Sequence, residues 1–409
     1  MSVSTTRAPS TPVVDQRRAT VILVAMAVST FLFVLVESLP SGLLTLMAPD
    51  LGRSTSDIGL LVTGYALVVL IASVPLAHWT RRVPRRWVLS ATVGLAAVST
   101  LWSGLAGDYT WVMTARLVTA LAQALFWVAV IPATTGLFPP RVRGRVMARL
   151  AIGNSLAPVL GVPAGTWLGE QTTWRAAFWA VAALSAVIFV IVILLFPTVR
   201  PQDGGAASAP FPDRRRFVFQ MVTTALVVTG SFGLITFVTQ VLQDVSGYPR
   251  ESMAALLLVQ GTAGVLGAVL VGRFIDRFSW GTLVVSLSVL VVAQTALWAL
   301  GEHRVAAVVC LAMFGFAFST VPPTLSHRVM LVAPGSTDMG VAISSSVFNL
   351  GIAGGSALGA LLTAEVGVRA VPLVGAGLVL LALVCTLAEH RFNAPLPASR
   401  HDAEEILES

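Results

Sequence analysis

Charged side chains are scarce in this sequence. Asp, Glu, Lys and Arg together make up 11% of its 409 residues, whereas hydrophobic residues make up 56% and the mean hydropathy is +0.85. A soluble domain usually carries charge on about a quarter of its residues. The charged surface that a water-soluble fold requires is therefore missing, and the chain is predicted to be an integral membrane protein.

Lysine is absent, and this absence excludes one class of transporter. All 26 basic side chains are arginines, so the chain cannot contain the glycine-rich phosphate loop that ends in lysine. ATP-driven transport by this chain alone is therefore excluded. The only two cysteines, Cys310 and Cys385, lie in apolar segments, which argues against a disulfide framework. The five histidines show no metal-ligand spacing, and we predict no catalytic constellation, cofactor or metal site.

The sequence contains many long apolar runs. Their lengths match those of membrane-spanning helices, which need about 20 residues, and they lack the alternation of a β-barrel. We predict about twelve spanning helices. Those of the first half are Thr20–Met47, Ile58–Ala77, Trp87–Leu105, Trp111–Leu137, Ala148–Leu168 and Trp174–Phe196. Those of the second half are Phe217–Leu242, Met253–Phe274, Thr282–Leu300, Val305–Val329, Met339–Ala364 and Ala370–Leu387.

The arginines orient the predicted helices. Nineteen of them lie in the two tails, in the segment 197–216 and in the short loops on the same side of the membrane. The loops of the other side hold four, namely Arg53, Arg250, Arg304 and Arg369. Because cytoplasmic loops carry the arginine excess, both termini are predicted to be cytoplasmic, in a bacterial inner membrane. The net charge of +7 is spread over these loops, so we expect no nucleic-acid partner.

The sequence divides near its midpoint into two similar halves. Residues 197–216 are rich in Pro, Gly, Ala and Ser and are typical of a flexible linker. It separates a bundle at 20–196 from one at 217–387, with cytoplasmic tails at 1–19 and 388–409. An arginine-rich segment and a stripe of glycines recur in the two halves at offsets of 195 and 198 residues. These repeats predict an all-α membrane protein with two pseudo-symmetric six-helix bundles.

Segments beside and within the helices combine residue types in recognisable patterns. Gly272-Arg-Phe-Ile-Asp276-Arg277 follows the eighth predicted helix. The counterpart after the second helix has Ala77 for the Gly and Arg81 for the Asp but keeps further basic residues, Arg82, Arg85 and Arg86. The predicted fifth helix carries small residues and a proline at Gly153, Pro158 and Gly161.

The first and fourth helices add two more patterns. The first contains Glu37-Ser-Leu-Pro40-Ser-Gly42-Leu-Leu, and the fourth contains Arg116 with Gln123. With these motifs the sequence resembles the major facilitator superfamily, in particular its bacterial drug–proton antiporters and sugar-efflux members. The resemblance implies a secondary transporter and assigns conformational roles to the glycine- and arginine-rich motifs. It does not name a substrate.

Glu37 is the most informative residue. It lies about 25 Å from the start of the first predicted helix, and it is the one acid well inside a predicted span. A carboxylate in hydrocarbon is costly unless it faces the bundle interior and serves a function. Because burial disfavours the charged form, the group should accept a proton near neutral pH. Arg116 is predicted at similar depth as its partner. The alternatives are a permanently paired structural carboxylate and a helix boundary that leaves Glu37 at the interface.

Polar and aromatic residues at membrane depth are the candidates for contacting substrate. Thr30, Phe33 and Ser41 share the helix face of Glu37, and Gln123 and Trp127 share that of Arg116. Each could instead pack in the core or join neighbouring helices. The remaining candidates, with the same alternative, are Asn154, Thr236, Gln240, Gln260 and Asn349.

Together these observations predict a secondary exporter rather than an enzyme. We expect a monomer that exchanges protons for a small organic molecule, such as a drug, an antibiotic or a sugar, by alternating access of a central cavity. One alternative is uptake by symport or facilitated diffusion, against which the antiporter-like fifth helix argues. A non-transporting membrane sensor is a further alternative, against which the pairing of Glu37 with Arg116 argues.

The arginine bias generates a topology prediction. A reporter that is active only in the cytoplasm should be active when it is fused at residue 205 or 409 and inactive at residue 107 or 303. Measuring reporter activity in membranes with equal amounts of each fusion checks the assignment. The opposite pattern of activity would place the termini outside.

Overall fold

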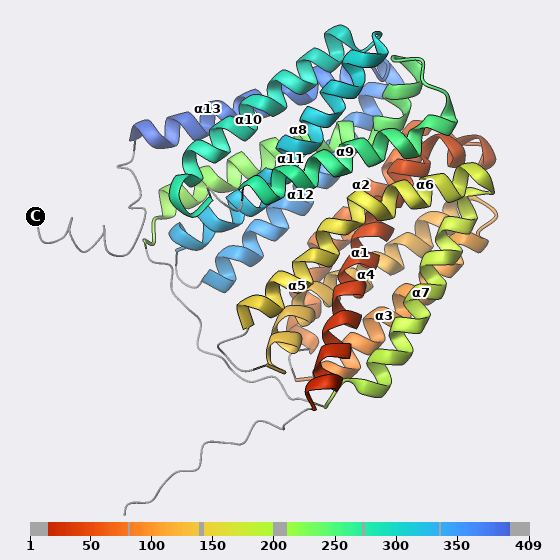
Figure 1. Ribbon diagram of the computed structural model, residues 1–409, viewed down its shortest axis with the longest axis vertical. Coiled ribbons are helices and arrows are strands. Elements are labelled where there is room, and N and C mark those ends of the chain that lie inside the picture. The colour runs from red at the N-terminus through yellow and green to blue at the C-terminus, as the bar shows by residue number, and fades with distance from the viewer. Residues whose placement is uncertain are drawn as a thin grey trace, which may run out of the picture.

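Long helices in two bundles make up the protein. The computed structural model describes residues 15–80, 82–138, 143–198, 211–271, 275–334 and 337–392, which are helical and contain no strand. The first half consists of α1 (Gln16–Asp50), α2 (Thr55–Thr80), α3 (Arg85–Leu105), α4 (Tyr109–Thr135), α5 (Arg143–Leu156), η2 (Ala157–Gly161), α6 (Val162–Gln171) and α7 (Trp174–Leu195). The second half consists of α8 (Arg214–Asp244), η3 (Arg250–Ser252), α9 (Met253–Val271), α10 (Ile275–Leu300), α11 (Arg304–Val332), α12 (Thr337–Glu365) and α13 (Ala370–Phe392). Figure 1 shows the two halves lying side by side.

Among the described residues, eleven helices are long and apolar enough to cross a membrane. The remaining predicted span, Ala148–Leu168, appears as the consecutive segments α5, η2 and α6. The backbone stays helical where these segments join. η2 is one π-helical turn that contains Pro158, and Pro163 follows it. Because a proline lacks the backbone N–H, it breaks the regular hydrogen-bond ladder, and a wider turn absorbs the break. Residues 143–171 therefore form one interrupted rod, which completes the twelve predicted helices.

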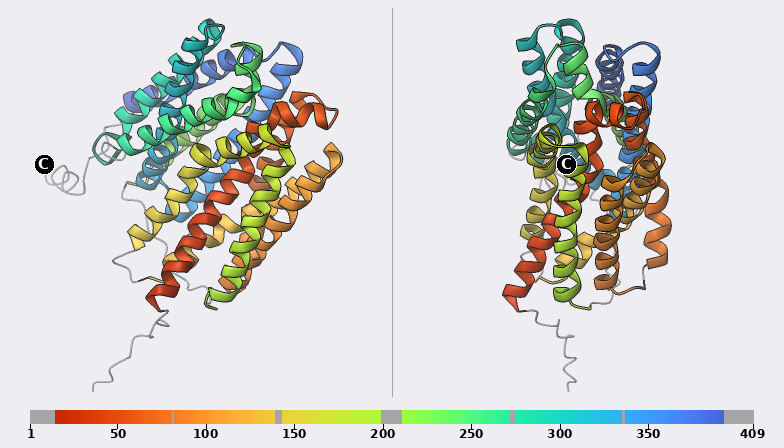
Figure 2. Two further views of the ribbon diagram at one scale, coloured as in Figure 1. Left: turned by 45° about the vertical axis from the view of Figure 1, so that its right-hand side comes forward. Right: turned by 90° about the vertical axis from the view of Figure 1, so that its right-hand side faces the viewer.

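The two halves pack by the same scheme, which confirms the predicted pseudo-symmetry. The first helix of each half contacts the fifth, as α1 contacts α5 and α8 contacts α12. The second contacts the fourth (α2 with α4, α9 with α11), and the third contacts the sixth (α3 with α7, α10 with α13). Between the halves, α2 packs on α12, α6 packs on α9 and α1 packs on α8. Figure 2 shows this arrangement from two further directions.

Small residues allow the first and fifth helices of each half to approach closely. A Cβ added at Gly153 of α5 would lie 1.9 Å from the Ala27 carbonyl oxygen of α1. At the equivalent contact in the second half, a Cβ at Gly355 of α12 would lie 2.4 Å from the Thr229 carbonyl oxygen of α8. Neither backbone could stay in place with a larger residue. The glycine stripes found in the sequence therefore mark tight helix–helix contacts.

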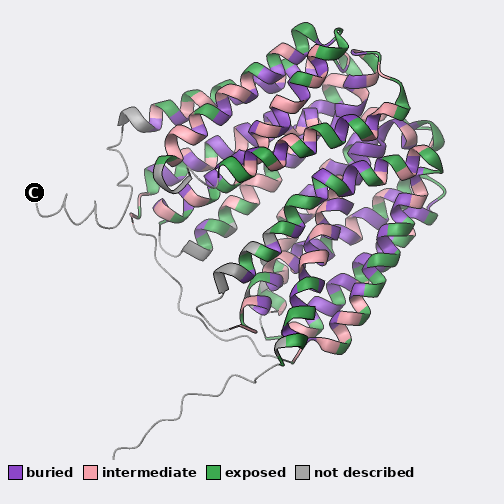
Figure 3. Ribbon diagram, viewed as in Figure 1, coloured by how far each residue is buried: buried purple, intermediate pink, exposed green. Residues whose placement is uncertain are grey.

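The lateral faces of the bundles are apolar and exposed, as expected for a protein surrounded by lipid. Val98 on α3, Leu194 on α7 and Leu361 on α12 are 66%, 65% and 63% exposed. Figure 3 shows buried residues between the helices and exposed ones along the outer faces. A soluble protein would not present apolar surface on this scale. The chain is a multi-pass membrane protein.

The halves contact each other most closely at one end. We call the end where α1 begins and α13 ends the terminal end, and the other the opposite end. The ribbons of the two bundles diverge toward the terminal end (Figure 1). In the second half of α1, the Ser41 carbonyl accepts a hydrogen bond from Thr239 Oγ1 of α8 (3.2 Å) and Thr45 Oγ1 accepts one from Gln243 Nε2 (3.0 Å). These contacts join the halves at the opposite end.

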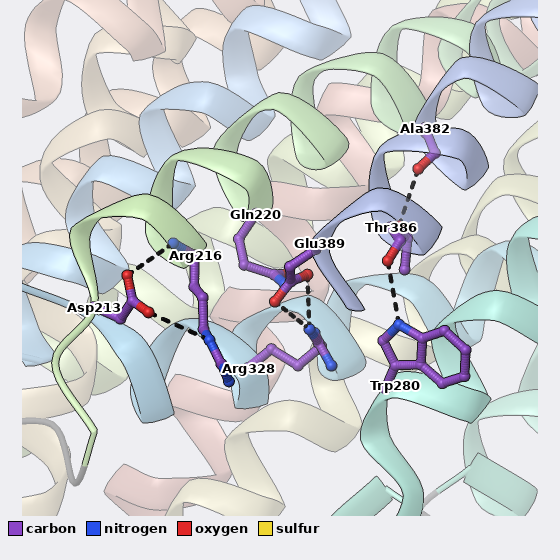
Figure 4. Close-up of polar contacts among 8 residues, drawn as sticks. All are labelled: Asp213, Arg216, Gln220, Trp280, Arg328, Ala382, Thr386 and Glu389. Atoms are coloured by element: carbon purple, nitrogen blue, oxygen red, sulfur yellow. Dashed lines mark hydrogen bonds and ion pairs between the residues drawn. The ribbon is translucent and has the colours of Figure 1, made fainter. Parts of the chain in front are cut away.

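Most helices of the second half extend past their predicted ends at the terminal end; α10, for example, begins at Ile275 instead of Thr282. α13 continues to Phe392 instead of ending at Leu387, because Glu389 is buried and held by other helices. Both of its carboxylate oxygens accept from Arg328 Nη2 of α11 (2.8 Å each), and Gln220 Nε2 of α8 donates to Oε2 (2.8 Å). α8 begins at Arg214, before the predicted Phe217, because Asp213 caps its first turn. Figure 4 shows this cluster.

The cluster generates a stability prediction. Glu389→Ala leaves the Arg328 guanidinium buried without its carboxylate, so we expect the free energy of unfolding to fall by about 3 kcal/mol or more. Thermal unfolding of the protein purified in detergent measures the loss. The control is Glu365→Ala, which removes an exposed carboxylate near the end of α12. If the two variants unfold at the same temperature, the pair does not hold the terminal end of α13 in place.

Candidate functional site

Three side chains form a hydrogen-bonded chain that joins α1, α2 and α4. The Tyr65 hydroxyl donates to Gln123 Oε1 (2.8 Å), and Gln123 Nε2 donates to Glu37 Oε2 (2.7 Å). Tyr65 and Gln123 are 0% and 2% exposed, so this polar chain lies in the core of the bundle. Because the amide oxygen is engaged by the phenol, its nitrogen is directed at the carboxylate. The position of Glu37 is thus fixed from two neighbouring helices.

Arg116 lies beside this chain and is fully buried. Its Nη1 donates to the Val36 carbonyl oxygen (2.8 Å) and its Nη2 to the backbone carbonyl oxygen of Glu37 (3.1 Å). Its Cζ lies 4.7 Å from the ring centre of Tyr65, a cation–π distance. Arg116 and Glu37 are therefore neighbours, as predicted, but the guanidinium bonds the backbone of α1 instead of the carboxylate. The negative charge of the Glu37 carboxylate favours the charged form of the guanidinium by electrostatic attraction, without a hydrogen bond between the two groups.

Pro40 explains why α1 has a carbonyl to offer. In an α-helix the carbonyl of residue 36 would accept from the N–H of residue 40, and proline has no N–H. Pro40 lies within α1, so the Val36 carbonyl lacks its helical donor, and Arg116 supplies one. The Glu-x-x-Pro spacing thus has a physical reason. One turn of α1 presents both a carboxylate and a carbonyl that is available to a buried cation.

Glu37 differs from its partners in its exposure. Arg116 and Tyr65 are buried, whereas Glu37 is half-buried. It lies one helical turn before Ser41, whose carbonyl is bonded by Thr239 of the other half. Glu37 therefore lies one helical turn along α1 from a contact between the two bundles. Its neighbours hold it in position without enclosing it completely.

Several predicted substrate residues of the first half serve in packing. Thr30 Oγ1 donates to the carbonyl oxygens of Ala27 (2.7 Å) and Leu150 (3.1 Å), and so joins α1 to α5. Phe33 is buried with its ring 4.3 Å from that of Phe126. Trp127 is half-buried and meets the same ring edge-on. Of these three predicted residues, only Trp127 keeps substantial exposure.

The predicted residues of α8 lie in helix contacts or at the opposite end. Thr236 is buried and its hydroxyl shares a hydrogen bond with that of Ser356 on α12 (2.9 Å). Gln240 Nε2 donates to Asp244 Oδ2 one turn later (3.1 Å). Gln240 and Asp244 line a pocket of ≈ 580 Å³ that also includes Glu302 and Arg369. Gln240 is therefore placed away from Glu37, toward the opposite end.

The remaining amide side chains keep some exposure. Asn154 on α5 is exposed, whereas Gln260 on α9 and Asn349 on α12 are half-buried. Asn349 Nδ2 donates to the Ser345 carbonyl oxygen of its own helix (2.9 Å). The structure therefore does not bring the predicted substrate residues together into one cluster.

The predicted conformational motifs have separate positions. In the first half, Arg82 is exposed and Arg85 half-buried, and Arg86 donates from Nε (3.1 Å) and Nη2 (2.5 Å) to the Ile193 carbonyl oxygen of α7. Gly161 lies in η2, where an added Cβ would lie 2.9 Å from the Phe31 ring of α1. In the second half, Gly272 lies outside the described residues, and so do the side chains of Asp276 and Arg277.

Sequence reasoning missed Tyr65 and Glu389. Tyr65 is one of three tyrosines, and its hydroxyl at membrane depth was a usable signal, since a buried phenol needs a partner. Glu389 was assigned to the C-terminal tail because the hydropathy falls after Leu387. Its partner Arg328 lies 61 residues earlier in the chain, so no local pattern reveals the pair.

Comparisons with known proteins agree with this architecture. Residues 26–338 match the family model described as Major Facilitator Superfamily. A crystal structure of a bacterial homologue of the human lysosomal transporter Spinster, inward-facing and unoccupied, is 18% identical with a TM-score of 0.70, over 92% of this chain and 98% of that chain.

Two further solved structures are similar. The human organic anion transporter MFSD10 (TETRAN) is 17% identical, with a TM-score of 0.68 over 91% of this chain and 100% of that chain. A mutant of the nucleoside transporter NupG is 13% identical, with a TM-score of 0.69 over 90% of this chain and 100% of that chain. At these identities the likeness concerns the fold. The family match covers most of the chain, which is therefore a membrane transporter rather than an enzyme and belongs to the major facilitator superfamily.

Proposed function

We propose that this transporter exports a small organic molecule, such as a drug, an antibiotic or a sugar, in exchange for protons. In this proposal the bundles at 20–196 and 217–387 rock against each other about the linker at 197–216. A site between them is thereby exposed to one side of the membrane at a time. The terminal end faces the cytoplasm of a bacterium, as the arginine bias favours.

The observation that carries the proposal is the placement of Glu37. The residue as a whole is half-buried, Gln123 donates to its carboxylate, and Glu37 lies one turn from the α1–α8 contact. A proton carrier must be reachable by protons and must also act on the contact between the halves. A permanently paired structural carboxylate would instead be enclosed with its cation, whereas Arg116 donates to backbone carbonyls.

Arg116 gives the protonation of Glu37 a structural consequence. While Glu37 is charged, its carboxylate offsets part of the cost of burying the guanidinium. When a proton neutralises Glu37, Arg116 keeps the carbonyl of Val36 but loses the attraction of its counter-charge. The hold of α4 on this turn of α1 is then weaker. Because α1 also bonds α8 at Ser41, protonation at Glu37 and the closure of the halves are linked, and a substrate that prefers the other state competes with the proton.

Substrate contacts are assigned to the polar and aromatic candidates that keep exposure. These are Trp127, Asn154, Gln240, Gln260 and Asn349. Thr30, Phe33 and Thr236 are instead assigned to packing, because their hydroxyls or rings are engaged by neighbouring helices. The carboxylate of Glu37 with the amide of Gln123 beside it suits cationic or hydroxyl-rich organic molecules.

The proposal predicts that Glu37→Gln abolishes active transport. The amide cannot release a proton, so a pH gradient should no longer drive substrate uptake into inverted vesicles. Glu37→Asp should retain part of the activity, because the carboxylate survives in a shorter side chain.

Arg116→Ala should also be defective in transport, since it removes the hydrogen-bond donor of the Val36 carbonyl. A panel of ethidium, chloramphenicol, a β-galactoside and a nucleoside identifies the compound to be measured.

The control for this experiment is Glu365→Gln, which neutralises an exposed carboxylate on α12. It should transport at the wild-type rate when equal amounts of protein are present. Undiminished pH-driven uptake by Glu37→Gln would contradict the proposal and leave Glu37 a structural group.

A further inference from the structure

Tyr65 is a fully buried tyrosine of α2 that reaches Glu37 through Gln123. Its hydroxyl donates to Gln123 Oε1 (2.8 Å), and Gln123 Nε2 donates to Glu37 Oε2 (2.7 Å). Its ring lies beside the guanidinium of Arg116, whose Cζ is 4.7 Å from the ring centre. Among the described residues, the amide of Gln123 is therefore the one hydrogen-bond partner of the hydroxyl, and the same amide bonds the carboxylate.

The side-chain amide of Gln123 has two possible orientations, and each suits one charge state of Glu37. With its nitrogen toward Glu37, the amide donates to a charged carboxylate, as it does in this arrangement. With its oxygen toward Glu37, the amide can accept a hydrogen bond only from a protonated carboxyl group. The turned amide would also leave the buried Tyr65 hydroxyl without an acceptor. Because a buried donor without an acceptor is costly, the phenol selects the orientation that suits the charged carboxylate.

The charged groups around Glu37 do not make this selection. Arg116 of α4 donates to backbone carbonyls, so its charge is the same in both orientations of the amide. On α1 and the helices packed against it, every other charged or titratable residue that the structure describes, apart from Tyr65, lies within the first or last two turns of its helix. Examples are Glu170 of α6, Arg175 of α7 and Asp244 of α8.

We propose that Tyr65 is a positioning residue, which fixes the amide of Gln123 in the orientation that favours the charged form of Glu37. The inference rests on the proposed role of Glu37 as the proton carrier, and it names the residue that sets how readily the proton is released. Without the phenolic hydroxyl, the Gln123 oxygen loses its donor. The amide is then free to turn and to accept a hydrogen bond from protonated Glu37, so the proton is held more tightly.

The place of Tyr65 on α2 connects this hydrogen bond with the second bundle. α2 packs on α12 of the other half and on α4 of its own half. The bond between Tyr65 and Gln123 therefore joins a helix at the contact between the bundles to the amide that bonds Glu37. A change in the packing of α2 that broke this bond would change the proton affinity of Glu37.

The experiment follows the protonation of Glu37 by infrared spectroscopy of the full protein in detergent, without substrate. The carboxyl band that disappears in Glu37→Gln reports this residue, and its intensity is recorded across a pH titration. Tyr65→Phe keeps the ring beside Arg116 and removes only the hydroxyl. We expect this variant to raise the pH of half-protonation by about one unit, or roughly tenfold in proton affinity, because one hydrogen bond to the amide is lost.

The control is Tyr109→Phe, which removes the hydroxyl that donates to the backbone carbonyl oxygen of Asp57 (2.8 Å) near the opposite end. It should titrate like the wild type. Gln123→Leu removes the amide that stabilises the charged carboxylate, so it should raise the pH of half-protonation by itself. Adding Tyr65→Phe to Gln123→Leu should produce no further shift, since Tyr65 acts through the amide. Unfolding temperatures show whether each variant is folded.

The proposal is overturned if Tyr65→Phe or Gln123→Leu titrates like the wild type, if Tyr109→Phe shifts as far as Tyr65→Phe, if Tyr65→Phe adds its full shift to that of Gln123→Leu, or if Glu37 shows no pH-dependent band. Because the titration uses no substrate, its result is separate from that of the transport assay. Undiminished pH-driven uptake by Glu37→Gln would contradict the proposed function and would leave the measured effect of Tyr65 on Glu37 standing.

Discussion

The burial of one guanidinium organises the first bundle. Arg116 is fully buried in a chain in which charged residues make up 11%. A desolvated charge requires hydrogen-bond acceptors and a counter-charge, because leaving it without them costs several kcal/mol (about 3–5). Pro40 provides an acceptor by leaving the Val36 carbonyl without its helical donor. Tyr65 provides a ring face, and Glu37 provides the negative charge. These contacts join α1, α2 and α4.

In the proposed mechanism, one proton must influence the contact between the two halves. The halves are joined at the opposite end by neutral hydrogen bonds, two of which extend from α8 to Ser41 and Thr45 of α1. Such bonds contribute about 1 kcal/mol each to stability. A tenfold difference in proton concentration corresponds to about 1.4 kcal/mol per proton. In the proposed mechanism, protonation of Glu37 is therefore a perturbation of the same order as one of these hydrogen bonds between the bundles.

The architecture could be predicted well because hydropathy indicates the spans of a membrane protein and small residues indicate its close helix contacts. The spans, the two halves and the close contacts at Gly153 were all visible there. The arrangement of the candidate residues was predicted in part. Glu37, Arg116 and Gln123 were identified and do lie together. The hydrogen-bond acceptors of Arg116 were not predicted correctly. An ion pair with the carboxylate was expected, whereas the guanidinium donates to backbone carbonyls. Thr30 and Thr236 bond neighbouring helices instead, since a hydroxyl at membrane depth looks the same in a cavity as in a helix contact.

In the mechanism that we propose, Glu37 releases the proton when substrate binds. The most direct measurement is the proton release of the purified protein in weakly buffered solution, followed with a pH indicator after the transported compound is added. The wild-type protein is expected to release protons in proportion to bound substrate. The Glu37→Gln protein should bind the compound and release none. If both proteins release protons equally, Glu37 does not carry the exchanged proton.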